Sequence, residues 1–393
     1  MTETIELKDL TTGYRVKGHD KTVSAHINAS LSEGQLTCML GPNGAGKSTL
    51  LRTIAGFQKP LDGSVYIGGQ DIRKTKPHDM ATRVSVVMSM NSDIRNMTAD
   101  EVVALGRSPY TGFWGRLSPK DKKAIDKCMA WMGIEHLRTR KMNTLSDGER
   151  QKVMIAKAIA QETPVVLLDE PTAFLDYPSK VSMMMLLHRL AHALHKTIFL
   201  STHDLEQALQ VADQIWLIDQ EKGLTTGMPE DLSAQGEIER YFCRKGIAFD
   251  RLTLALSVEH EYAREVICRG QEGDLHYGLL RHALQRNAIR PITSAAEATL
   301  PSTMPDICVE AQPGGSYSLH QPGHDDTRTQ TIGQLVGLLN TALVHTQIQA
   351  IGGDSDSDQR QDGAPDHAQP VEYIEPLRPD AQKQNRTQEK TQD

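Results

Sequence analysis

The segment Gly41–Ser48 restricts the fold of this chain more than any other, because its sequence GPNGAGKS fits the pattern G-x-x-x-x-G-K-[ST]. It follows the apolar run Gln35–Leu40 and precedes the helical run STLLRTIAG. In this setting the glycines let backbone N–H groups surround a phosphate, and the helix points its positive dipole end at it. Lys47 is expected to reach the β- and γ-phosphates, and Ser48 to offer a hydroxyl to Mg²⁺. The residues expected to bind ATP here are Gly41, Pro42, Asn43, Gly44, Ala45, Gly46, Lys47, Ser48 and Thr49.

A second apolar run, Val165–Glu170, ends in two carboxylates. At the end of a strand, Asp169 can hold Mg²⁺ through water, and Glu170 can accept a proton from an attacking water. His203 follows the run Thr197–Thr202 and is expected at the same edge of the sheet, where its imidazole would contact the γ-phosphate and steady Glu170. A purely structural role at a solvent edge is the alternative for these residues. The upstream loop favours the catalytic interpretation.

Short apolar runs alternate with helical patterns from Ile5 to about Gly246, which is typical of an α/β domain with a largely parallel sheet. Ser64–Gly69 lies between two turn signals and predicts an antiparallel strand. Capping signals at Thr98 and Ser118 predict helices from near residues 99 and 119, within a helical insert from about residue 90 to 145. The expected central strands, which lack polar alternation, are Gln35–Leu40, Pro164–Glu170, Thr197–Thr202 and Gln214–Asp219.

Length and composition narrow the classes of function. The 393 residues are enough for two or three folded units. Lys and Arg total 43 against 50 Asp and Glu, so the chain lacks the basic excess of a nucleic-acid-binding protein. The five cysteines are odd in number, widely spaced and form no CxxC pair, which argues against both a disulfide framework and a zinc site. We find no apolar run of roughly 20 residues and no signal peptide in the acidic N-terminus, and expect a cytoplasmic protein.

Beyond residue 249 the pattern changes. Residues 250–347 predict a small α+β domain, with a hairpin across Pro313–Gly315 and a helix whose apolar residues start at Ile332. Residues 348–393 carry almost no apolar periodicity and are expected to form a disordered acidic tail. Histidines of the α+β domain lack metal-ligand spacing and are expected at the surface: His260, His276, His282, His320 and His324.

One further motif selects a family among P-loop proteins. Leu145–Gln151, with the sequence LSDGERQ, stands shortly before the Val165–Glu170 run and resembles the LSGGQ signature of ABC-transporter ATPase subunits. Other elements follow in the family's order: Tyr14 as the adenine-stacking aromatic, Phe174–Asp176 as the D-loop, and Ser201–Asp204 with its switch histidine. The resemblance covers about residues 5 to 246.

The resemblance implies a P-loop NTPase fold: an ABC cassette over residues 1–249 with a RecA-like parallel-sheet core, an antiparallel β subdomain and a helical subdomain at about residues 90–145. It also implies a head-to-tail homodimer, in which Ser146, Gly148 and Asp176 read the ATP held by the partner's loop. Transmembrane permease subunits, and through them a substrate-binding protein, would be the other partners, with no nucleic acid. The subunit would lie on the inner face of the membrane. The segment Leu105–Tyr110 (LGRSPY) and the overall spacing resemble those of the ATPase subunits that power uptake of iron-siderophore complexes, haem or cobalamin.

The sequence departs from the family pattern at two places. Asp147 and Glu149 replace the usual glycine and glutamine, and their charges are expected to weaken a closed dimer. After the run Arg83–Val87, the family has a glutamine that contacts Mg²⁺ and senses the permease, whereas this chain has none. Ser89 is the expected substitute, with shorter reach, and Asn91 is the next candidate.

Other functions compete with import. A soluble ABC clamp in DNA repair or translation would carry a long coiled-coil insert or a second cassette, and this chain has one P-loop and a short insert. An exporter ATPase is the third alternative. For residues 250–347, a packed or dimer-stabilising appendage and a regulatory domain both stay open.

Overall fold

The structure is a computed structural model that describes residues 3–16, 19–88, 94–112, 114–297, 299, 303–312 and 314–352. The chain divides into two compact units, Met1–Glu261 and Tyr262–Asp393. The division falls beyond the boundary expected at residue 249. No helix of the described residues is long and apolar enough to span a bilayer.

The first unit is built on a six-stranded sheet with the order β10-β9-β3-β8-β7-β6. All neighbours in it pair in parallel except β10, which runs antiparallel to β9. The four central strands expected from the sequence are confirmed. The strands are β3 (Leu36–Leu40), β6 (Val84–Val87), β7 (Val165–Asp169), β8 (Thr197–Thr202), β9 (Gln214–Asp219) and β10 (Gly223–Gly227).

The two faces of this sheet are covered by different layers. On β3, Leu36 and Cys38 pack in one hydrophobic cluster with side chains of α5 and α6, whereas Met39 packs in a second cluster with side chains of α1 and the antiparallel sheet. Because both faces are covered, every residue of β3 and β8 is buried, which explains why their sequences lack an alternation of apolar and charged residues. The covering helices are α1 (Lys47–Ile54), α5 (Asp147–Ala160), α6 (Tyr177–Ala193) and α7 (Leu205–Val211).

A second, antiparallel sheet has the order β2-β1-β4-β5. The antiparallel strand expected at Ser64–Gly69 is β4, whose Val65 and Ile67 are buried against the core of the parallel sheet. The bounds are β1 (Glu3–Val16), β2 (His19–Ser32), β4 (Asp62–Ile67) and β5 (Gln70–Asp71), followed by α2 (Pro77–Ala81).

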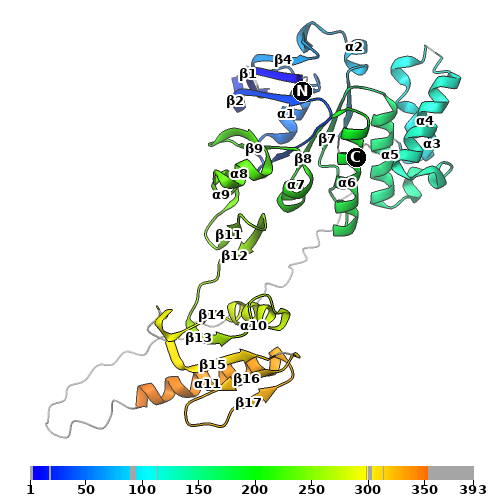
Figure 1. The fold of residues 1–393 in the computed structure, drawn as a ribbon. Helices are drawn as coiled ribbons and strands as arrows, with labels where there is room; N and C mark the ends of the chain where they lie inside the picture. Colours follow the sequence, from blue (N-terminus) through cyan, green and yellow to red (C-terminus); the bar gives the residue numbers. More distant parts are fainter. Residues whose placement is uncertain are drawn as a thin grey trace, which may run out of the picture. The chain divides into compact units, whose positions relative to one another are not determined.

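The helical insert contains α3 (Ala99–Leu105) and α4 (Pro119–Met132), which pack on each other and on α5 (Figure 1). Both helices begin where the capping signals predict. Thr98 and Ser118 each accept a backbone N–H of their helix's first turn, and a carboxylate three residues on accepts the N–H of the cap residue in return.

The LGRSPY motif joins these helices. Gly106 is required because a Cβ there would lie 2.2 Å from the Lys157 carbonyl of α5. The buried Arg107 donates to Asp121 at 2.9 Å and to Glu162 at 2.8 Å, and its guanidinium stacks on the Tyr110 ring. The motif therefore fixes α3, α4 and the end of α5 to one another.

The last elements of the first unit explain the later boundary. They are α8 (Pro229–Ala234), α9 (Glu237–Phe242), β11 (Ile247–Asp250) and β12 (Ala255–Val258). β11 and β12 pair with each other, and Phe249 and Leu256 pack against the first unit's core. This burial holds the hairpin in the first unit.

Among its described residues, the second unit has a five-stranded sheet, β14-β13-β15-β16-β17, and two α-helices. Leu335, Leu339 and Leu343 of α11 are fully buried against it, as their spacing predicts. α11 continues to Gly352, so residues 348–352, expected in the tail, belong to this helix; the rest of the expected tail, residues 353–393, lies outside the described residues. The bounds are β13 (Arg264–Arg269), α10 (Leu275–Arg286), β14 (Ile289–Ile292), β15 (Thr303–Ala311), β16 (Tyr317–His320), β17 (Thr327–Thr329) and α11 (Ile332–Gly352).

The histidines expected at the surface beyond residue 249 differ in exposure; His260 falls in the first unit and the other four in the second. His282 and His324 are exposed, whereas His260, His276 and His320 are half-buried. His276 lies 3.0 Å from the Tyr317 hydroxyl, and His320 pairs with Asp326 at 2.7 Å. These contacts account for the partial burial of His276 and His320.

Candidate functional site

The loop Gly41–Ser48 connects β3 to α1, and its shape depends on two glycines. A Cβ on Gly41 would lie 2.1 Å from the Ile218 carbonyl oxygen, and one on Gly46 would lie 2.4 Å from a methyl of Val23. Gly46 also has φ 98° and directly precedes the helix. The backbone therefore takes a path that side chains would block, with the N-terminus of α1 facing into the loop.

Lys47 lies inside this loop. Its Nζ donates to the carbonyls of Gly41 at 2.7 Å and Pro42 at 3.2 Å, and the residue is 7% exposed. Burial lowers the pKa of the Lys47 ammonium, while the nearby carboxylates of Glu170 and Asp169 oppose that shift. The loop thus presents a cation at its centre with two carboxylates close by.

Asp169 links the loop to β8. Its Oδ1 accepts a hydrogen bond from the Ser48 hydroxyl at 3.1 Å and another from the Ser201 hydroxyl at 2.6 Å. The Ser201 oxygen in turn accepts the backbone N–H of Glu170 at 3.0 Å. Hydroxyl and carboxylate oxygens are the ligands that Mg²⁺ prefers, so Ser48 and Asp169 fit a magnesium site.

Glu170 and His203 lie together at the same edge of the sheet. His203 Nδ1 is 3.7 Å from Glu170 Oε2, and both side chains are more than one-third exposed. Glu170 has φ 50°, a left-handed conformation that a non-glycine residue adopts only where its surroundings enforce it. The expected proximity of Asp169, Glu170 and His203 is present in the structure.

Tyr14 lies beside the loop Gly41–Ser48, hereafter the cradle. Its hydroxyl is 2.8 Å from Thr49 Oγ1 on α1, and the residue is 41% exposed. The ring therefore stands at the solvent edge of the loop.

The signature residues occupy the N-terminus of α5. Ser146 accepts the Glu149 N–H at 3.2 Å, and the Glu149 carboxylate accepts the Ser146 N–H at 2.9 Å. Glu149 therefore completes a capping box, which gives the departure from glutamine a local structural use. The two added acids each face an arginine: Asp147 pairs with Arg150 at 3.1 Å and Glu149 with Arg140 at 3.4 Å. These pairs offset part of the negative potential expected there.

The D-loop ends at Asp176, which caps α6 by accepting the Ser179 N–H at 3.0 Å. Phe174, two residues earlier, is 93% exposed. Gly148 of the signature lies near Leu175 of this loop, with only 3.7 Å between a built Cβ and a Leu175 methyl. The D-loop and the signature helix thus adjoin each other in one chain.

Two polar residues of the site were not singled out from the sequence. Ser201 bridges Asp169 and Glu170, and Gln220 donates to the Gly44 carbonyl at 2.7 Å. A serine in a buried strand carries little signal by itself, and the only clue to Ser201 was its place near the end of an expected strand, two residues before His203. Ser89 and Asn91, named for the missing glutamine, lie outside the described residues.

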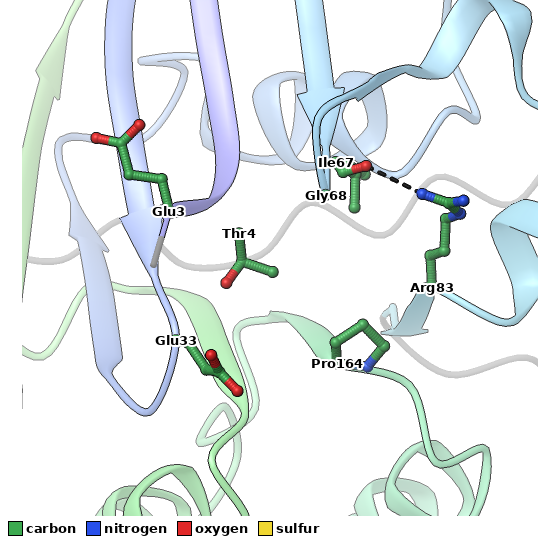
Figure 2. Close-up of a pocket in the computed structure, with 7 residues that line it drawn as sticks. All are labelled: Glu3, Thr4, Glu33, Ile67, Gly68, Arg83 and Pro164. Atoms are coloured by element: carbon green, nitrogen blue, oxygen red, sulfur yellow. Dashed lines mark hydrogen bonds between the residues drawn. The ribbon is translucent and has the colours of Figure 1, made fainter. Parts of the chain in front are cut away.

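A pocket of about 210 Å³ lies at the other edge of the parallel sheet. Figure 2 shows Pro164 and Arg83 in it, residues that precede the amino ends of β7 and β6. Arg83 donates to the Ile67 carbonyl at 3.2 Å. Because ligands of open α/β sheets bind at the carboxyl ends of the strands, the loop Gly41–Ser48 is a better candidate than this pocket for a phosphate-binding site.

Comparisons with known proteins identify a family. The family model described as ABC transporter matches residues 25–173. An uncharacterised ABC transporter ATP-binding protein of Methanocaldococcus jannaschii is 38% identical over 68% of this chain and 93% of its own length. The ferric enterobactin transport ATP-binding protein of Escherichia coli is 34% identical over 56% of this chain and 82% of its own length.

A further relative and a solved structure are also similar to this chain. The cobalamin import ATP-binding protein of Halobacterium salinarum is 32% identical over 63% of this chain and 62% of its own length. The structure of CbiO1 from Clostridium perfringens, part of an ABC transporter complex, matches with a TM-score of 0.53 at 26% identity, over 61% of this chain and 94% of that one. Both matches cover about the length of the first unit.

Proposed function

Because the chain belongs to the family of ABC transporter ATP-binding proteins, we propose that it energises an importer of an iron complex, either a siderophore or haem, or of cobalamin. Proteins of this family hydrolyse ATP to power transport, and this chain is such an ATPase. Support for the class of transported compound comes from relatives named for ferric enterobactin and cobalamin transport. The LGRSPY motif agrees with this choice.

The proposed ATP hydrolysis rests on one observation, a chain of hydrogen bonds beside the cradle. It joins Ser48 to Asp169, Asp169 to Ser201, and Ser201 to the backbone of Glu170. Lys47 would exchange its bonds to the loop carbonyls for the β- and γ-phosphates of ATP. Glu170 would accept a proton from the attacking water, and His203, 3.7 Å away, would hold that carboxylate in place and contact the γ-phosphate. Mg²⁺, when bound by Ser48 and Asp169, would neutralise phosphate charge.

A dimer would complete the site. Within one chain the Ser146 hydroxyl donates to the Glu149 carboxylate at the N-terminus of α5. The first turn of α5 offers backbone N–H groups and the positive end of the helix dipole to an anion. We propose that Ser146, Gly148 and Asp176 meet the ATP held by the loop Gly41–Ser48 and by Tyr14 of a second copy. Closing and reopening of that dimer would move the transmembrane permease partners, with a substrate-binding protein upstream.

The remaining residue proposed for Mg²⁺, Ser89, rests on the sequence alone, as the substitute for the family's glutamine. The proposed place of the subunit is cytoplasmic, peripheral on the inner face of the membrane. A soluble clamp or an exporter ATPase stays the alternative. The short insert with α3 and α4 is unlike the long coiled coils of repair proteins.

This function predicts a permease and a binding protein in neighbouring reading frames, and co-expression of the chain with such partners tests it. The complex is reconstituted in vesicles, and ATP-dependent uptake of a ferric siderophore, haem and cobalamin is measured separately. We expect uptake of one class with the wild-type chain and none with Glu170→Gln. Outward transport, or ATP hydrolysis stimulated by nucleic acid and not by the permease, would support an alternative instead.

A further inference from the structure

A cluster of metal-ligating side chains lies away from the nucleotide site. His188 and His192 come from successive turns near the C-terminal end of α6, and Asp213 directly precedes β9. One ligand atom from each of the three lies within 4.8 Å of the others. Asp213 is bonded to Leu36 at the start of β3, whereas the phosphate loop follows the end of that strand. The cluster and the cradle are therefore at opposite edges of the sheet.

The separations suit a small metal ion. Zinc–nitrogen and zinc–oxygen bonds of about 2.0–2.1 Å put the ligands of a tetrahedral ion about 3.3 Å apart. Asp213 Oδ1 lies 3.1 Å from Nε2 of His192 and 3.6 Å from Nε2 of His188. All three ligand atoms lie within 4.8 Å of one another, so side-chain adjustments within the cluster could bring them to one ion.

The carboxylate is held in place by the backbone. Asp213 Oδ2 accepts the Leu36 N–H at 2.8 Å, which fixes the group in the way that outer hydrogen bonds orient ligands in metal sites. The histidine spacing of i, i+4 places both rings on one side of α6. A hydrogen bond to the Asp213 carboxylate requires only His192. The His188 imidazole lies 3.6 Å from Asp213 Oδ1 and is not needed for that bond.

Solvent reaches the cluster through a cavity of about 550 Å³ that His192 and Asp213 line together with His195. The cavity wall also carries Glu33 and Glu230, and none of the described residues that line it is a lysine or arginine. A cation is thus favoured there, and water has room to complete its coordination.

We propose that His188, His192 and Asp213 bind a divalent transition-metal ion, with Zn²⁺ the best match. Two imidazoles and one carboxylate suit zinc and its neighbours, whereas Mg²⁺ and Ca²⁺ prefer oxygen ligands only. The site is separate from the magnesium site at Ser48 and Asp169. By joining α6 to the start of β9, a bound ion stabilises the folded first unit.

Zinc titration calorimetry on the full chain tests the proposal. The protein is prepared without a histidine tag, stripped with a chelator and free of nucleotide, so that neither a tag nor ATP binds zinc. We expect one zinc ion per wild-type chain at this site, and at least tenfold weaker binding in His188→Ala and in His192→Gln. Zinc is also expected to raise the melting temperature of the wild type and not of these variants.

His26→Gln is the matched control. His26 forms an exposed pair with Asp9 at 2.8 Å and does not belong to the cluster of His188, His192 and Asp213. It should bind zinc like the wild type. The rings of His188 and His192 are 38% and 50% exposed, so both variants should fold, which circular dichroism checks. Equal zinc binding by all four proteins, or none by the wild type, would overturn the proposal and leave the cluster as a hydrogen bond between α6 and β9.

Discussion

The Ser201 hydroxyl donates a hydrogen bond to Asp169 Oδ1 at 2.6 Å, across the register pair that the two residues form between β7 and β8. The same oxygen accepts the N–H of Glu170 at 3.0 Å. One side chain therefore orients both the carboxylate proposed for Mg²⁺ and the backbone of the proposed base. Ser201 lies on β8, which ends at Thr202 directly before His203, so the β7–β8 pairing brings the proposed catalytic residues to one edge of the sheet.

Ser201→Ala should lower the rate of ATP hydrolysis at least tenfold and change ATP affinity far less, because the loop Gly41–Ser48 provides most phosphate contacts. Steady-state hydrolysis beside equilibrium ATP binding measures the two effects. Thr197→Val is the control, since it removes a buried hydroxyl from the opposite end of β8, bonded to Thr4 and Ser32. An equal loss of hydrolysis in both variants would mean that Ser201 acts through stability only.

Lys47→Ala and Glu170→Gln should fail in different ways. The first removes the cation inside the loop and should abolish ATP binding. The second keeps the shape of the side chain and loses the base, so it should bind ATP and hydrolyse it at least a hundredfold more slowly. Size-exclusion chromatography with ATP should then show a trapped dimer of Glu170→Gln. A monomer at saturating ATP would contradict the proposed dimer.

Arg107→Ala should destabilise the helical insert by about 3–5 kcal/mol, because it leaves the buried Asp121 carboxylate without its partner. Urea unfolding measures the free energy. Arg138 is a matched control in the same insert: it also contacts two carboxylates, Asp100 and Asp126, but is 38% exposed. Arg138→Ala should cost under about 1 kcal/mol. Similar losses of unfolding free energy in the two variants would contradict the stabilising role proposed for the buried pair of Arg107 and Asp121.

Glu149→Gln tests the charge of the signature helix. The Ser146 N–H lowers the pKa of the Glu149 carboxyl from its ordinary 4.5, so folding favours the ionised form. The ionised group therefore adds stability that is fully present above pH about 4.5 and is lost as the pH falls through the lower folded pKa. We expect wild type to be more stable than Glu149→Gln at pH 7 and the difference to vanish in acid. Urea midpoints at several pH values measure this, and a pH-independent difference would contradict it.

Ser89→Ala should change ATP affinity less than about threefold, which is under about 0.65 kcal/mol, while lowering permease-stimulated hydrolysis by a larger factor. Binding is measured on the isolated subunit and turnover in the assembled complex. Unchanged stimulated turnover would move the role to Asn91 or a backbone carbonyl.

Local patterns in the sequence determined the elements and most of the site. The cradle Gly41–Ser48, the strand ending in Asp169 and Glu170, and the caps at Thr98 and Ser118 each lie within a few residues, so spacing alone predicts them. Contacts between distant segments were decided by the tertiary structure. Pairing of β7 with β8 brings Ser201 to Asp169, and packing of β11 and β12 on the first core moves the domain boundary to Glu261.

The same distinction holds for the charged residues. A single sequence shows that Asp147 and Glu149 are acidic, but only the fold places Arg150 and Arg140 against them. His188 and His192 are visible as an i, i+4 pair on a helix, yet Asp213 joins them only because β9 starts beside the end of α6. Short-range geometry is fixed by covalent chain spacing, whereas contacts across the sheet depend on strand order, which many residues determine together.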